Sequence, residues 1–122
     1  MSDAEPSLSS LEGIWQPVYA ELDGEEAPRM ALEQMELELA EGKYTVRFGG
    51  EAHDHGTFET TETIITLRGI RGTNEGRTIP SLFKVTENAL SICYGLGGHC
   101  PAKFATGPGQ QIYLVNYQRK TG

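Results

Sequence analysis

The stretch MELELAEGKYTVRF, residues 35–48, decides the fold class of this chain. A two-residue turn at Glu41-Gly42 would bring its two halves together as antiparallel strands. The apolar residues then pair across the turn as Met35 with Phe48, Leu37 with Val46 and Leu39 with Tyr44. The other face pairs Glu36 with Arg47. A slip by one residue would mix the two faces, so the pattern predicts a hairpin with one buried side.

Two further segments have the same alternation. The first joins residues 56–60 to residues 63–67, and with Thr61-Glu62 as its turn Phe58 faces Ile65 and Gly56 faces Leu67. The second turns at Glu87-Asn88, so that Val85 faces Leu90 and Phe83 faces Ile92. Short alternating runs separated by turn residues at regular intervals are typical of a sheet built from hairpins.

Residues 14–22 and 111–119 are also expected to be strands, which brings the number to about eight. The sequence therefore predicts an all-β fold, an antiparallel up-and-down barrel whose closure removes exposed edges. One short helix is expected at residues 27–33, where Pro28 suits a first helical turn, and it is expected to cover one end of the barrel. Residues 1–10 are expected to form a loose arm, and residues 11–122 one barrel domain without linker or repeat.

The charge of the chain is negative and uneven. Net charge is −7, and residues 1–42 hold eleven acidic residues against one basic residue, Arg29. This balance argues against a nucleic-acid partner, which needs clustered Lys and Arg. Without an apolar run of eighteen residues no membrane span is expected. The acidic start lacks the features of a signal peptide, so the expected location is the cytoplasm unless a leader has been removed.

Several short motifs resemble lipocalin-like barrels. Residues 11–15, LEGIW, resemble their Gly-x-Trp opening, and Gln118-Arg119 resembles their closing Arg. More closely, the chain resembles a family of uncharacterised bacterial lipocalin-like domains, well represented in planctomycetes. The motifs shared in order are Leu22-Asp23-Gly24, Lys43-Tyr44-Thr45, Gly56-Thr57-Phe58, Asn74-Glu75-Gly76 and Leu90-Ser91-Ile92-Cys93. In the loop before the last strands, members of the family often have Arg-Pro where this chain has Cys100-Pro101. A role of the family's Arg at the rim of the barrel is therefore not expected to carry over to this chain.

The resemblance implies a lipocalin-like barrel that binds a small apolar molecule, without naming the ligand. It also implies that Trp15 closes the bottom of the barrel and that Arg119 stacks across its ring, a structural role worth about 0.5–2 kcal/mol. Pro17 marks an irregular edge, so the sequence leaves open whether Trp15 shares the face of Ile14 and Val18.

Two clusters have the residue types of metal sites. His53 and His55 share one strand face, but if Phe58 and Gly56 point inward both histidines point outward. Cys93, His99 and Cys100 lack a fourth ligand, and two reduced thiols are the simpler interpretation. We therefore expect neither a metal nor a cofactor. Because no nucleophile is accompanied by a base and an orienting acid, we also expect no enzymatic activity.

The interior remains as the candidate site. Tyr44, Phe58 and Tyr113 are the residues expected to line a pocket for a small apolar or amphipathic molecule, in a cavity of roughly 300 Å³ or more. The alternative is a protein-interaction or structural module with a filled core and an acidic binding face. A haem-binding barrel is a third option, and it would need a histidine directed into the cavity.

Overall fold

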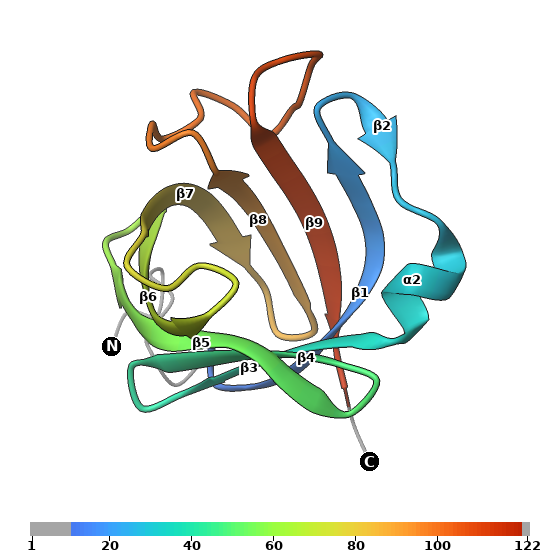
Figure 1. Cartoon of the computed structure of the whole chain (residues 1–122), viewed down its shortest axis with the longest axis vertical. Helices are drawn as coiled ribbons and strands as arrows, with labels where there is room; N and C mark the ends of the chain where they lie inside the picture. Colours follow the sequence, from blue (N-terminus) through green and yellow to red (C-terminus); the bar gives the residue numbers. More distant parts are fainter. Residues whose placement is uncertain (1–10, 121–122) are drawn as a thin grey trace.

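In a computed structural model, which describes residues 11–120, the chain forms a closed antiparallel barrel with one short helix (Figure 1). The strands are β1 (Gly13–Leu22), β2 (Glu25–Glu26), β3 (Met35–Ala40), β4 (Lys43–Phe48), β5 (Glu51–Thr60), β6 (Ile64–Gly72), β7 (Thr78–Val85), β8 (Ala89–Gly95) and β9 (Ile112–Arg119), and the helix is α2 (Arg29–Glu33). β1 pairs with both β3 and β9, which closes eight strands in sequence order, while the two-residue β2 lies outside the barrel. The predicted fold class is confirmed.

The β3–β4 hairpin, formed by residues 35–48, has the predicted register. β3 and β4 pair Leu37 with Val46 and Glu36 with Arg47, and the Arg47 and Glu36 side chains form an ion pair at 3.7 Å. The turn has positive φ at both Glu41 (54°) and Gly42 (78°). This is the backbone of a type I′ turn, whose twist matches that of the strands beside it. The β7–β8 hairpin is likewise confirmed, with Val85 opposite Leu90.

The predicted register of the β5–β6 hairpin is wrong by two residues. Phe58 lies opposite Leu67 instead of Ile65, because four residues instead of two separate the last pair of the hairpin, Thr60 and Ile65. In that loop the Thr61 amide donates to the Ile64 carbonyl at 2.8 Å, and the Ile64 amide donates to the Thr61 hydroxyl at 3.1 Å. A two-residue hairpin turn needs positive φ, which a β-branched threonine resists. The shift is even, so each side chain keeps its predicted face.

Gly56 lies on the inward face of β5, where a missing side chain suggests space for a ligand, but the structure gives another reason for glycine here. A Cβ at this position would lie 1.9 Å from the Arg68 carbonyl oxygen. The β5–β6 register shifts between His55 and Gly56, so the two backbones approach closely there. The missing side chain therefore makes room for the neighbouring strand and not for a ligand.

The irregularity of β1 places Trp15 inside. The pairing of β1 with β9 shifts between Pro17 and Tyr19, and the extra residue, Val18, is exposed. Trp15 and Pro17 are both buried, so Trp15 lies on the face opposite to Val18. The Trp15 indole nitrogen donates to the Leu11 carbonyl at 2.8 Å. The Arg119 guanidinium lies 4.3 Å from the centre of the indole ring, as the resemblance implied.

The helix is shorter than predicted and does not cover an end of the barrel. α2 begins after Pro28 and packs against β1 (Figure 1), with Leu32 as its buried residue. β1 pairs with β3 only as far as Trp15. Beyond this point the side-chain amide of Gln16 donates to the backbone carbonyls of Leu32 and Met35. α2 therefore fills the side of the barrel at which β1 leaves β3.

Candidate functional site

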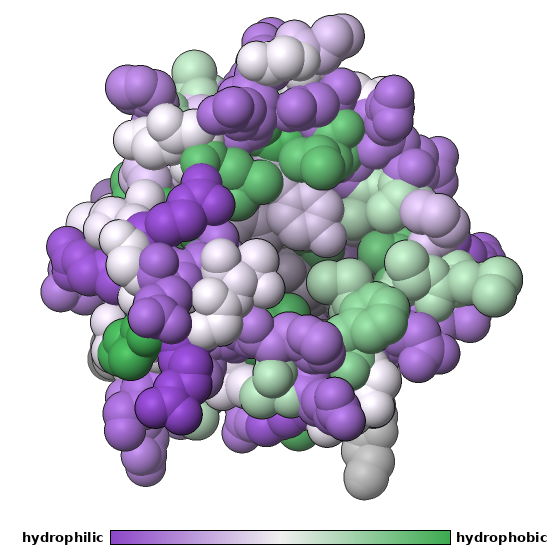
Figure 2. Space-filling model, viewed as in Figure 1, coloured by the Kyte–Doolittle hydropathy of each residue, from purple (hydrophilic) through white to green (hydrophobic). Residues whose placement is uncertain are grey.

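The barrel interior is not filled. It contains a cavity of about 440 Å³, whose opening lies near the centre of the face in Figure 2. Twelve of its eighteen lining residues are apolar or aromatic: Pro17, Met35, Leu37, Tyr44, Val46, Phe48, Leu67, Ile79, Tyr94, Leu96, Tyr113 and Tyr117. The other six are Glu36, His53, Asp54, Thr73, Asn74 and Arg77. The size and the mainly apolar lining are those of a small-molecule site.

The up-and-down topology sets which connections surround the opening. Alternate connections of an antiparallel barrel gather at the same end, and the β4–β5, β6–β7 and β8–β9 connections lie around the opening. Rim residues come from them or from the strand ends beside them, namely Phe48, His53, Asn74 and Leu96. At the other end Trp15 and its buried apolar neighbours fill the barrel. Phe48, expected inside, is 45% exposed because it ends β4 at the opening.

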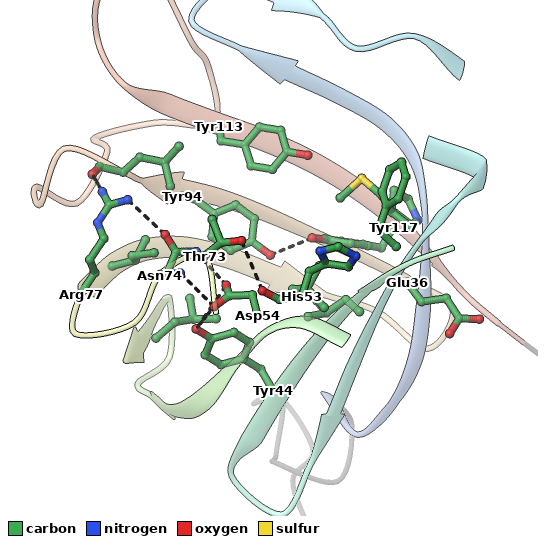
Figure 3. Close-up of a pocket in the computed structure, with 18 residues that line it drawn as sticks. Glu36, Tyr44, His53, Asp54, Thr73, Asn74, Arg77, Tyr94, Tyr113 and Tyr117 are labelled. Atoms are coloured by element: carbon green, nitrogen blue, oxygen red, sulfur yellow. Dashed lines mark hydrogen bonds between the residues drawn. The ribbon is translucent and has the colours of Figure 1, made fainter. Parts of the chain in front are cut away.

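Asp54 is a buried carboxylate in the cavity wall, with 6% of its surface exposed. Asn74 binds it twice, through its amide nitrogen at 3.1 Å and its side-chain nitrogen at 2.7 Å. The Tyr44 hydroxyl lies 3.4 Å from both carboxylate oxygens (Figure 3). These donors tie the β6–β7 connection and β4 to β5 at the cavity wall.

Three more tyrosines form the opposite wall of the cavity (Figure 3). The hydroxyls of Tyr94 and Tyr117 share a hydrogen bond of 2.7 Å. The ring of Tyr113 stacks on that of Tyr94, with 5.7 Å between the ring centres. Within residues 11–120, no hydrogen bond joins the Tyr113 hydroxyl to another side chain or to the backbone. Tyr113 therefore offers a free donor and acceptor to whatever occupies the cavity.

Burial raises the pKa of all four cavity tyrosines above the usual value of about 10. For Tyr44 the neighbouring Asp54 charge raises the pKa further. For Tyr117 the partner hydroxyl of Tyr94 does the same. The phenols are consequently protonated at neutral pH and present hydroxyl groups, not phenolates, to the cavity.

These raised pKa values predict a loss of stability in alkali. In the unfolded chain tyrosines ionise near pH 10, whereas the folded chain holds their protons more tightly. The stabilisation is therefore complete below about pH 10 and falls as the pH rises toward the folded-state pKa values. We expect the free energy of unfolding, from urea titrations at pH 8 to 11, to fall more steeply for the wild type than for Tyr94→Phe/Tyr117→Phe. Parallel curves for the two proteins would contradict this assignment.

The structure brings together two of the three residues predicted to line a pocket. Tyr44 and Tyr113 both line the cavity. Phe58 is buried but lies outside the cavity lining, since it is two residues further along β5 than Gly56, the partner of Tyr44, toward the filled end of the barrel. Trp15 and Arg119 lie together at that filled end and do not contribute to the cavity.

Sequence reasoning missed Asp54, which is the one buried charged residue of the described chain. The signal was present, since Asp54 is two residues before Gly56 and four before Phe58, and so shares their inward face. The candidate metal motif, His53 and His55, lies on either side of Asp54 and was predicted to point outward. His53 does reach the rim, where its ring packs edge-on against Phe48 at 6.2 Å.

The two clusters whose residue types occur in metal sites do not converge in the described residues. Among residues 11–120, no group of three or more His, Cys, Asp or Glu side chains is placed to hold a metal ion. Cys93 is buried with its thiol directed at the Lys103 carbonyl, 3.5 Å away, and Cys100 is exposed. Burial raises the pKa of the Cys93 thiol, which lowers the fraction of reactive thiolate at neutral pH.

Comparison of the chain with protein-family models, with curated proteins and with solved structures finds no match. Within residues 11–120, no helix has the length and apolar character that crossing a membrane requires.

Proposed function

We propose that the protein is a binding protein, not an enzyme, and that it holds one small apolar or amphipathic molecule inside the barrel. The observation that carries the proposal is the cavity of about 440 Å³, open at one end and lined mainly by apolar and aromatic side chains. Empty apolar space costs contacts that a filled core would make, so a chain that only needed to fold would gain by filling it. The cavity is near the small end of the range for ligand sites, which favours a small ligand.

The resemblance of residues 11–15 and the later motifs to lipocalin-like domains supports the same proposal, because such barrels generally bind small apolar molecules. The alternative, an interaction module with a filled core and an acidic face, is less well supported. The acidic face of that alternative comprises Glu25-Glu26 and the Glu33–Glu41 region, and it is partly neutralised, since Glu36 forms ion pairs with Arg47 and Lys120. The open interior also does not match a filled core.

Filling the cavity tests the proposal. The neutral fluorescent probe N-phenyl-1-naphthylamine is titrated into the wild type, with emission reporting transfer to an apolar site. Val46 lines the cavity, so Val46→Phe should occupy part of the space and raise the Kd at least about tenfold, or about 1.4 kcal/mol. Val18→Phe is the matched control, because Val18 is 54% exposed on the outside. Absence of probe binding to the wild type, or equal Kd values for all three proteins, would refute the proposal.

A further inference from the structure

Within the described part of the chain, the one buried charged side chain, Asp54, has no counter-charge. Among residues 11–120, no Lys, Arg or His nitrogen lies within ion-pair distance of the Asp54 carboxylate, although four other ion pairs form. Arg77, the one lysine or arginine among the residues that line the cavity, donates instead to the Asn74 side-chain oxygen at 3.1 Å and to the Leu96 carbonyl. A buried carboxylate without a cation is costly to desolvate, which a purely structural position would avoid.

The hydrogen bonds of Asp54 also leave room for another donor. A carboxylate accepts about four hydrogen bonds. Asn74 supplies two at normal distances, whereas the single Tyr44 hydroxyl is 3.4 Å from each oxygen and binds neither closely. A ligand donor could therefore approach at a shorter distance than Tyr44 does.

The surroundings of Asp54 favour a positively charged donor. The four tyrosines in the wall remain neutral at physiological pH, and aromatic rings attract organic cations. A carboxylate ligand would meet Asp54 as a like charge, and two of the five N–H groups of Arg77 already donate to Asn74 and to the Leu96 carbonyl at the rim. An alcohol would bind Asp54 without charge assistance, which makes the weaker hydrogen bond.

From this arrangement we propose that the cavity selects amines: molecules with a small apolar body and one ammonium group that binds the Asp54 carboxylate. The apolar body lies against side chains such as Leu37, Leu67 and Ile79. The inference rests on the proposed binding function and adds the chemical class of the ligand.

A competition series in the wild type tests the proposal. Octylammonium, 1-octanol and octanoate have the same chain and differ in the polar end. Each is used at pH 7 to displace N-phenyl-1-naphthylamine. We expect octylammonium to bind about tenfold or more tightly than 1-octanol, and octanoate to bind most weakly. Equal binding of amine and alcohol, or tighter binding of octanoate, would overturn the amine preference while leaving the binding function standing. Absence of binding by the fluorescent probe itself would overturn the binding function as well.

Two variants separate the charge of Asp54 from its structural hydrogen bonds. Asp54→Asn removes the charge and should reduce the preference for octylammonium over 1-octanol to about twofold or less. Asn74→Ala removes the side-chain donor to Asp54 but keeps the backbone amide and the carboxylate, and it should weaken both compounds in similar proportion. Retention of the full preference by Asp54→Asn would contradict the proposal. If circular dichroism shows that Asp54→Asn does not fold, the order of the three compounds in the wild type decides alone.

Discussion

Replacing Trp15 by alanine is expected to lower the free energy of unfolding by about 3–5 kcal/mol. The side chain is fully buried at the filled end of the barrel. In the wild type the Leu11 carbonyl accepts a hydrogen bond from the indole nitrogen, so removal of the side chain leaves both a cavity and an unpaired carbonyl. It also exposes the guanidinium of Arg119, which stacks on the ring and donates to the Glu12 carbonyl at 2.7 Å. The free energy of unfolding of a small domain is only about 5–15 kcal/mol, so this variant should approach the limit at which the chain still folds.

Trp15→Phe is the matched control, since it keeps an aromatic ring beneath Arg119 but removes the indole donor. It should lose clearly less stability than Trp15→Ala. Both are compared with the wild type by urea unfolding followed by far-ultraviolet circular dichroism, because Trp15 is the single tryptophan and its fluorescence is lost in either variant. A loss below about 1 kcal/mol for Trp15→Ala would mean that the end of the barrel collapses around the gap.

The sequence predicts the barrel well wherever strict alternation meets a turn of known chemistry. The β3–β4 register follows because the apolar and charged faces are both specified and Gly42 allows a two-residue turn. The β5–β6 register cannot be predicted in the same way. Threonines lie on both sides of the connection, and any shift by an even number of residues leaves each side chain on the same face. The local hydrogen bonds of Thr61 then decide the loop length, and alternation does not report them.

The cavity is harder to predict than the barrel around it. Alternation shows which side chains point inward, but not how far along the barrel each one lies. Phe58 and Tyr44 both point inward, yet Phe58 packs into the filled end while Tyr44 lines the cavity. Asp54 was predictable by the same inward alternation, and it is unusual because a charge on an inward position conflicts with core packing. Such a conflict within an otherwise consistent strand is where a functional residue is expected.

Replacing Gly56 by alanine should destabilise the protein by about 2–3 kcal/mol, and the sign of the effect is the test. The backbone of Gly56 does not have the positive φ that favours glycine. Chain entropy alone would therefore make alanine stabilising by about 0.4–1 kcal/mol. Against this, the new Cβ would meet the Arg68 carbonyl oxygen at 1.9 Å and the Gly69 Cα at 3.0 Å. These are backbone atoms of the paired strand, which cannot move aside as a flexible side chain can.

Gly107→Ala provides the matched control, because Gly107 also lacks a positive φ but faces only the flexible Gln110 side chain, at 3.1 Å. Urea unfolding should show a change within about 0.5 kcal/mol there. The clash at Gly56 has a second consequence, since separating β5 from β6 would shift Asp54, two residues away, relative to Asn74 on the β6–β7 connection. Gly56→Ala should therefore weaken binding of octylammonium as well as stability, whereas Gly107→Ala should change neither. A stabilised Gly56→Ala would mean that the strands separate without cost, and the close approach would then not be what requires glycine at this position.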